Sequence, residues 1–469
     1  MDGLECSEVL FSQLTAERRI DAEYFNKHDL LLKKTIENKI HVRLDDISTV
    51  TDGIHTSIDY DETSGINLIS ATSPKQNRFD LSRKAYISKE AHIANPRTAL
   101  HENDVVISTV GTIGNCAVVE KNILPANSDR HVGIIRLKST INPYVLSTFL
   151  LTKYGRNQTI RETTGNVQPN LFLYKIREII IPVFGDVFQQ TVKNTVTEAH
   201  TLLDKADQQY LTAEQLLENE LGVDMSAISD GGVSIKSCSE CFNIQNRIDA
   251  EFYQPKYDKI QEAIKNYDKN AKSLNEIAAY VFTGECAKEY FTYQKGFLHY
   301  IRGTNIHDGL VDVDVNYSVV PDNHSKLVSS GDIVTGRVGT IGKFGVISDE
   351  LNGAACSDNV LCFRLPDSYQ PNVYALYFNS APIRELTDRM SRGSVQQRLN
   401  QETLRELIIP FIPVPVQDQI NSQITLSFLL RAKAEQMLEY AKQAVEMAIE
   451  KDETTAAAWL EDKIEKLNI

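Results

Sequence analysis

Two glycines spaced three residues apart are the first feature of this chain that could do chemistry. Residues 104–119 read DVVISTVGTIGNCAVV, in which GTIG separates two apolar runs. Glycine amides that follow a strand can cradle a phosphate when a helix begins directly after them. Here no Lys-Ser/Thr pair follows, as a nucleotide-binding loop requires, and the next residues enter a second apolar run. The pattern therefore predicts a turn between two strands, with a phosphate-backbone contact through those amides as the alternative.

Other catalytic and metal-binding patterns are weak. Of the seven cysteines, Cys238 and Cys241 form a CxxC pair, but no second pair stands at zinc-ribbon spacing and no histidine lies nearby. A metal or redox role is therefore not favoured. The chain also lacks GxGxxG for a dinucleotide, GxxxxGK[ST] for ATP and an N/D-P-P-Y/F segment for a flipped adenine. We predict no catalytic residue, no metal site and no cofactor bound by this chain itself.

The sequence repeats itself with an offset of 228 residues. A period this long indicates a duplicated domain with its connector, since solenoid repeats are 20 to 50 residues long. Gln189 recurs as Gln417 at the same offset. The longest repeated segments are DVVISTVGTIGNCAVV and DIVTGRVGTIGKFGVI (104–119 and 332–347), RIDAEYF and RIDAEFY (19–25 and 247–253), GNVQ and GSVQ (165–168 and 393–396), and REIIIP and RELIIP (177–182 and 405–410).

Each copy is expected to consist of short strands and turns followed by one long helix. Apolar segments at 104–110 and 116–120 predict strands on either side of GTIG. Residues 145–154 and 373–379 have the composition of helices, and the segments that end in Pro182 and Pro410 predict closing strands. The fold class is therefore α/β, present twice.

Apolar residues spaced alternately by three and four indicate a coiled-coil seam in each long helix. The alternative is a helix that packs only on its own domain. Because both copies carry the pattern, we expect the two helices to pair, and residues 1–228 to form a complete unit. The helix-pairing residues are Leu203, Ala206, Tyr210, Ala213 and Leu217 in the first copy, and Ala434, Leu438, Ala441, Val445 and Ala448 in the second.

These patterns divide the chain into six segments. The linker is recognised by its glycine and serine content. The expected boundaries are 1–186 for the first domain, 187–222 for the first long helix, 223–245 for a linker, 246–413 for the second domain, 414–450 for the second long helix and 451–469 for a C-terminal tail.

Composition narrows the class of protein. The chain has 469 residues and a formal net charge of −14. That charge argues against nucleic acid as a partner, although a basic face can coexist with acidic helices. The sequence has no apolar run near 18 residues and no charged-then-apolar leader, so we expect a cytoplasmic protein without a membrane partner.

The repeated motifs resemble the specificity subunit of type I restriction-modification systems. RIDAEYF at the start of each copy, VGTIG between strands, G-x-V-Q-x-x-L (165–171 and 393–399), IIIP or LIIP, and the Gln that opens each long helix carry the resemblance. It implies two α/β target recognition domains, each reading one half of a split double-stranded DNA site. Two long antiparallel coiled-coil helices would join them with pseudo-two-fold symmetry and set the half-site spacing.

The resemblance also implies partners that carry the chemistry. The subunit would itself be non-catalytic. It would recruit methyltransferase (modification) subunits, expected to be two, and ATP-dependent translocating restriction subunits. S-adenosylmethionine, ATP and magnesium would therefore belong to the partner subunits.

Candidate DNA contacts are polar side chains on loops, because base edges are read by Arg, Lys, Asn, Gln and His. For any one of them, a solvated surface charge is the alternative. The copies diverge most between about residues 50 and 100 and between about 278 and 330, as two readers of different half-sites would. The candidates are His55, Lys75, Asn77, Arg78, Arg130, His131, Arg161 and Gln168 in the first copy, and Lys295, Arg302, Asn305, Arg337, Lys343, Arg389, Arg392, Gln396 and Arg398 in the second.

Three other classes of protein stay open at this point. A specificity subunit of a type IIB-like restriction enzyme would carry the same motifs. An enzyme with a duplicated domain is disfavoured, because histidines do not repeat in register and no carboxylate-lysine motif occurs in both copies. A coiled-coil adaptor without a nucleic-acid partner would suit the acidic charge.

Overall fold

The computed structural model describes residues 7–11, 14, 19–81, 85–138, 141–163, 169–223, 225, 228, 233–241, 248–292, 294–312, 317–321, 325–391 and 398–467. The chain divides into two compact units. The first unit is Met1–Asp204 with Leu430–Ile469, and the second unit is Lys205–Leu429. Within the described ranges, no helix has the length and apolar character needed to cross a membrane.

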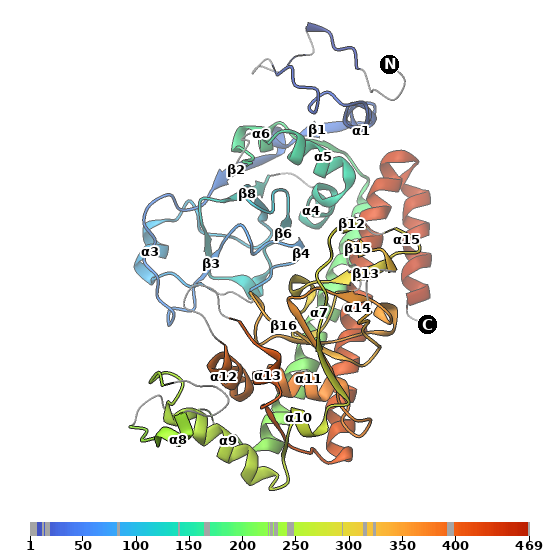
Figure 1. The fold of residues 1–469 in the computed structure, drawn as a ribbon. Helices are drawn as coiled ribbons and strands as arrows, with labels where there is room; N and C mark the ends of the chain where they lie inside the picture. Colours follow the sequence, from blue (N-terminus) through green and yellow to red (C-terminus); the bar gives the residue numbers. More distant parts are fainter. Residues whose placement is uncertain are drawn as a thin grey trace. The chain divides into compact units, whose positions relative to one another are not determined.

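Each unit is built on a five-stranded sheet, and the strand order is the same in both. Strands β2, β8, β6 and β4 of the first sheet are labelled in Figure 1. The order is β2-β8-β5-β6-β4 in the first unit and β11-β19-β16-β17-β14 in the second. Only the last pair in each order is parallel. The repeat in the sequence is thus a repeat of the fold. The strands are β2 (Ser48–Asp52), β4 (Gln76–Asn77), β5 (Val105–Ser108), β6 (Cys116–Val118) and β8 (Val132–Leu137), and β11 (Tyr280–Thr283), β14 (Gly309–Leu310), β16 (Ile333–Gly336), β17 (Phe344–Val346) and β19 (Val360–Arg364).

Smaller sheets differ between the units. Two-stranded antiparallel pairs occur in both: β1 (His41–Arg43) with β9 (Ile180–Pro182), and β10 (Lys272–Ser273) with β20 (Ile408–Ile409). The first unit adds a parallel pair, β3 (Asn67–Ile69) and β7 (Ala126–Ser128). The second has four strands instead, β12 (Phe291–Thr292), β15 (Tyr317–Val319), β13 (Leu298–Ile301) and β18 (Ala355–Cys356). The regions where the copies diverge in sequence therefore also diverge in structure.

Each unit has a separate core, to which most of its short helices contribute buried side chains, whereas the described residues of α3 and α8 contribute none. The short helices of the first unit are α1 (Lys27–Glu37), α2 (Leu44–Ile47), α3 (Lys89–Ala94), α4 (Pro143–Leu151), α5 (Lys153–Arg161) and α6 (Leu173–Arg177). Those of the second unit are α8 (Cys238–Cys241), α9 (Pro255–Tyr267), α10 (Leu274–Ile277), α11 (Pro371–Asn379), α12 (Ala381–Met390) and α13 (Gln401–Leu404).

The GTIG motif is a turn in both units, as its spacing predicts. It joins the antiparallel strands β5 and β6 in the first unit, and β16 and β17 in the second. Gly111 and Gly114 have φ of 72° and 78°, and Gly339 and Gly342 have 78° and 79°. A side chain is strained in this left-handed region, which explains why both copies keep both glycines.

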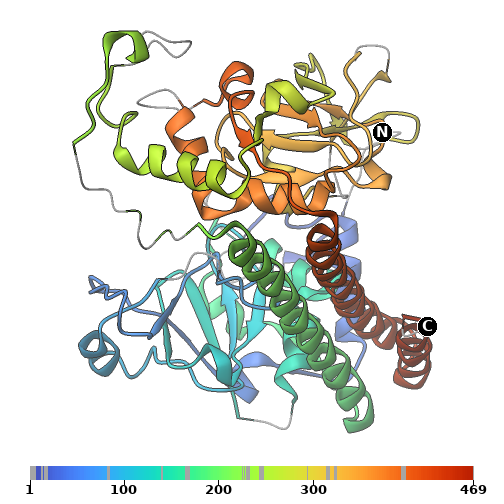
Figure 2. The same cartoon turned by 90° about the horizontal axis from the view of Figure 1, so that it is seen from below.

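The two long helices are α7 (Asp186–Leu221) and α14 (Val414–Glu450), drawn in green and dark red in Figure 2. In the first unit, Leu203 of α7 clusters with Ala434 and Met437 of α14. In the second unit, Leu217 of α7 clusters with Ile420 of α14. The beginning of one helix therefore packs on the end of the other in each unit, so the helices are antiparallel.

Most residues expected to pair the helices are buried. Tyr210 and Leu438 are half-buried, and the Tyr210 ring stacks on Phe428 at 6.2 Å between centroids. The early turns of α14, which also supply buried side chains through Ile420 and Ile424, were not part of the predicted seam. The buried members of the prediction are Leu203, Ala206, Ala213, Leu217, Ala434, Ala441, Val445 and Ala448.

The segment expected to be a C-terminal tail is instead a helix, α15 (Glu453–Leu467). Ala456 and Leu460 are fully buried in the core of the first unit. The Glu453 carboxylate accepts a hydrogen bond from the Gly185 backbone N–H at 2.8 Å. The expectation that residues 1–228 form a complete unit is therefore wrong, since the first unit needs residues 430–469 to complete its core.

The same hydrogen bond occurs at equivalent positions within each unit. Gln189 Oε1 accepts from the Asn142 backbone N–H at 2.8 Å, and Gln417 Oε1 accepts from that of Gln370 at 2.8 Å. These bonds link the start of each long helix to the helix that follows the last sheet strand. The repeated Gln therefore has a structural role.

Candidate nucleic-acid interface

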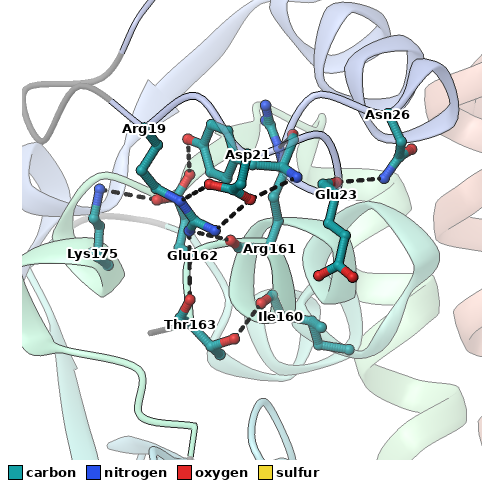
Figure 3. Close-up of polar contacts among 10 residues, drawn as sticks. Arg19, Asp21, Glu23, Asn26, Ile160, Arg161, Glu162, Thr163 and Lys175 are labelled. Atoms are coloured by element: carbon teal, nitrogen blue, oxygen red, sulfur yellow. Dashed lines mark hydrogen bonds and ion pairs between the residues drawn. The ribbon is translucent and has the colours of Figure 1, made fainter. Parts of the chain in front are cut away.

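The RIDAEYF motif docks against the end of α5, directly before the first GNVQ segment (Figure 3). The Tyr24 ring lies between the guanidinium groups of Arg19 and Arg161, whose carbons are 4.3 and 3.9 Å from the ring centroid. The Tyr24 hydroxyl donates to Glu162 Oε1 at 2.6 Å. Burial, with the Glu162 carboxylate next, raises the pKa of Tyr24 well above its usual value, so this hydroxyl remains a donor.

Two further ion pairs fix this arrangement. Arg19 holds Asp21 through two nitrogen–oxygen contacts of 2.9 and 3.0 Å and donates to the Arg161 carbonyl at 3.1 Å. The Lys175 ammonium lies 2.9 Å from Glu162 Oε2, and Lys175 is only 5% exposed. The described residues on both sides of the GNVQ segment are thereby held in one network.

Arg161 and Arg389 were expected to contact DNA, and the structure gives each of them partners at the start of its own repeat. Arg161 Nε donates to the Tyr24 carbonyl at 2.7 Å, and Arg389 Nε donates to the Phe252 carbonyl at 2.7 Å. The Arg389 guanidinium also lies over the rings of Phe252 and Tyr257, at 4.3 and 5.0 Å. Each arginine therefore positions the start of its own repeat, and a DNA contact by the same side chain stays a prediction.

Two loops that are far apart in the sequence meet beside the first sheet. The backbone N–H of Ile54 donates to the Ser128 carbonyl at 2.8 Å, and the N–H of Thr109 donates to the His131 carbonyl at 3.0 Å. A Cβ added to Gly53 would lie 2.1 Å from the Asp129 carbonyl oxygen, so the close approach requires glycine. We call residues 52–55 and 128–131 the first loop cluster. It places His55, Arg130 and His131 on two adjacent backbone segments.

Asp52 binds two neighbouring side chains, His55 of the first loop cluster and Arg97. Its carboxylate lies 2.6 Å from His55 Nε2 and 2.9 Å from an Arg97 nitrogen. Burial acts to raise the pKa of Asp52, but hydrogen bonds from His55 and Arg97 outweigh it and lower the pKa below its usual value. Sequence reasoning did not select Arg97, because its partner lies 45 residues earlier and no spacing rule connects them.

The second unit has the same loop frame with different side chains. Arg337 occupies the position of Thr109: its N–H donates to the Asn359 carbonyl at 2.8 Å, and its carbonyl accepts from Leu399 at 3.0 Å. In the first unit Thr109 accepts from Leu171 in the same way, at 2.9 Å. We call residues 283–286 and 356–359 the second loop cluster.

The two loop clusters carry different side chains on matching backbone hydrogen bonds. In the second unit the Arg337 guanidinium donates to the Asp358 carbonyl at 2.9 Å. The offset of 228 places Asp358 and Asn359 where the first unit has Arg130 and His131. One scaffold therefore presents two different sets of hydrogen-bonding groups, which is the arrangement that two different recognition surfaces need.

Asn77, another predicted DNA contact, is buried in the structure. It is 2% exposed, its side-chain amide donates to Thr148 Oγ1 at 2.9 Å, and its oxygen accepts from the Ser147 hydroxyl. Its φ is 62°, and Gly309 at the matching place in β14 has φ of 88°. Asn tolerates this left-handed backbone better than most residues, so Asn77 serves the fold and cannot reach a base.

Several remaining candidates already have partners within the protein. The Lys75 ammonium lies 3.8 Å from Asp80, and Arg302 lies 4.5 Å from the Tyr317 ring centroid. Asn305 Oδ1 accepts from the Arg302 backbone N–H at 2.9 Å. These contacts do not test whether the same side chains bind DNA, so DNA binding by Lys75, Arg302 and Asn305 stays a prediction.

The exposure of the other candidates varies. Arg78, His131, Arg337 and Lys343 are half-buried, whereas His55, Arg130, Lys295 and Arg398 are exposed. Gln168, Arg392 and Gln396 lie outside the described residues. Among the residues that the structure does describe, no group of three or more His, Cys, Asp or Glu is arranged to hold a metal ion.

Comparisons with known proteins identify a family model that matches part of the second unit and solved structures that are similar over most of the chain. Residues 266–427, which lie within it, match a family model described as the type I restriction modification DNA specificity domain. No curated protein matches the chain in sequence. Among solved structures, the S subunit of a type I restriction-modification system from M. genitalium is similar over 90% of this chain and 96% of its own, at 12% identity and a TM-score of 0.40. The HsdS subunit from Thermoanaerobacter tengcongensis is similar over 88% and 97%, at 12% identity and a TM-score of 0.28.

Proposed function

We propose that this chain, whose residues 266–427 match the model of the type I restriction modification DNA specificity domain, is the DNA-recognition subunit of a type I restriction-modification complex. The family match is the observation that carries the proposal. The first unit has the same strand order and the same repeated motifs, which supports a second recognition domain in residues 1–186.

Each unit would read one half of a bipartite, asymmetric DNA site. The two loop clusters support this part of the proposal, because they have matching backbone hydrogen bonds and different polar side chains. Base edges are distinguished by such side chains, whereas contacts to phosphates set position. The exposed His55 and Arg130 in the first unit, and Lys295 and Arg398 in the second, are the first residues to test.

We propose that chemistry is left to partner subunits. Methyltransferase subunits, two in number, would bring S-adenosylmethionine, and translocating restriction subunits would bring ATP and magnesium. This chain would contribute sequence choice and assembly without catalysis, and the complex would act in the cytoplasm. The DNA specificity domain favours this reading over a coiled-coil adaptor without a nucleic-acid partner.

The test is to assay DNA methylation with the purified chain, with its cognate methyltransferase subunit, and with both together. We expect methylation of defined sites only from the mixture. Methylation by the isolated chain with S-adenosylmethionine would show that it is an enzyme. A methyltransferase that modifies the same sites without this chain would remove its role in specificity.

A further inference from the structure

A cavity of about 340 Å³ lies in the second unit, between α7, α11 and α12. Leu217 and Leu376 provide apolar surface along it, and Asn379 and Ser380 add polar groups. The charged side chains that line it are Glu214, Glu218, Asp308 and Arg384.

The cavity carries an excess of negative charge. Among the described residues that line it there are three carboxylates and one cation, Arg384. That cation is already engaged, because its terminal nitrogen lies 2.6 Å from Asp308 Oδ1. Burial, followed by the neighbouring Glu218, raises the pKa of Glu214. Like charges held together in a partly buried site favour the entry of a cation.

The first unit shows what occupies the equivalent place. At the offset of 228, Lys153 corresponds to Ala381, and Glu446 corresponds to Glu218. The Lys153 backbone N–H donates to Glu446 Oε1 at 2.8 Å, and its ammonium lies 4.0 Å from Glu446 Oε2. The same ammonium is 2.5 Å from Glu450. In the first unit, a lysine of the chain itself therefore neutralises the glutamates of the long helix.

The second unit keeps Glu218, has Gly222 where the first unit has Glu450, and lacks the lysine. Ala381 has no charged side chain, and Glu214 stands where the first unit has Lys442. Two positive charges are thus replaced by one neutral and one negative side chain, and a cavity is present at that place.

We propose that this cavity binds a lysine side chain of a partner protein. Its ammonium would lie between Glu214 and Glu218, and its aliphatic stem would pack along Leu217 and Leu376, as lysine stems do on apolar surfaces. The internal lysine of the first unit is the precedent for this chemistry. The inference concerns a protein contact and goes beyond DNA recognition.

The first experiment places the missing lysine in the full-length chain. Ala381→Lys should raise the melting temperature relative to Ala381→Met, which has a similar apolar stem and no charge. In a Glu218→Gln background the difference between the two variants should disappear. A lysine variant that is no more stable than the methionine variant would show that the cavity does not favour an ammonium group, and the proposal would be withdrawn.

The second experiment measures binding directly by calorimetry. The probe is N-acetyl-lysine methylamide, and its Nε-acetylated form is the control, because acetylation removes the charge. We expect binding of the charged probe only, weakened at least about tenfold in Glu218→Gln and in Ala381→Lys, since a hydrogen bond to a charged group contributes about 1.5–3 kcal/mol. Equal binding of both probes, or unchanged binding in Ala381→Lys, contradicts the proposal. Tighter binding of putrescine or of magnesium alone would replace a lysine side chain with a free polyamine or a metal as the ligand.

Discussion

Replacing Arg389 by alanine should weaken the second unit without changing which DNA sequence it prefers. The substitution removes the hydrogen bond from Nε to the Phe252 carbonyl and the contacts with the rings of Phe252 and Tyr257. A hydrogen bond from a charged group contributes about 1.5–3 kcal/mol, and each partly exposed cation–π contact about 0.5–1 kcal/mol. We therefore expect a loss of roughly 2.5–5 kcal/mol, or roughly 5–20 °C in melting temperature for a unit of this size.

Hydrogen exchange locates the effect, and Arg398 provides the matched control. In Arg389→Ala, residues 248–267 and 381–391 should lose protection while the first unit stays unchanged. Arg398 is exposed, so Arg398→Ala should melt like the parent and weaken DNA binding. If it contacts a base, the loss should be about 1–3 kcal/mol and confined to one half-site. An Arg389→Ala protein with unchanged stability and a relaxed half-site would refute the anchoring role and restore Arg389 as a base reader.

Three further predictions concern stability and assembly. Asp332 is fully buried and pairs with Arg364 at 2.7 Å, so Asp332→Ala should cost about 3–5 kcal/mol in unfolding experiments because it leaves a charge unpaired; a cost below about 1 kcal/mol would contradict this. A hydrogen bond from His200 lowers the pKa of Glu120 below its ordinary 4.5. The ionised Glu120 therefore contributes its full stabilisation above pH 4.5, and this contribution is lost as the pH falls through the lowered pKa. Glu120→Gln should reduce this pH dependence in acid denaturation, and a profile identical to that of the parent would contradict the prediction. In the full chain, Leu217→Asp should lower the melting temperature, because Leu217 is buried in one cluster with Ile420 of α14 and the substitution places a charge there; an unchanged melting temperature would show that the helices do not pair through this seam.

The repeat, the turn and the long helices were predictable because their signals are local or periodic. GTIG keeps two glycines wherever both must adopt positive φ, and the seam residues recur at helical spacing. α7 begins at Asp186 and α14 at Val414, beside the expected 187 and 414. The fold class followed from the same patterns, since identical motifs in register predict identical elements.

What sequence reasoning missed depends on contacts between distant residues. Asn77 has the side chain of an adenine reader, but its backbone angle and its bonds to Ser147 and Thr148 bury it. In the sequence Arg389 resembles a surface cation, because its contact with the Phe252 ring joins two residues that lie far apart in the chain. Residues 453–467 look like a polar tail, because the first-unit core that receives Ala456 and Leu460 is built mainly from residues more than 250 positions earlier.

The most direct test of two independent half-site readers is to map DNA methylation across a genome that contains this chain and its methyltransferase. We expect one asymmetric, bipartite motif with an unspecified spacer. A helix of 36 residues such as α7 spans roughly 54 Å at about 1.5 Å per residue, and at about 3.4 Å per base pair this limits half-site centres to about 16 base pairs apart. Substitutions in the second loop cluster should alter one half of the motif and leave the other intact. A continuous motif of four to six base pairs, or a single substitution that changes both halves, would contradict the account.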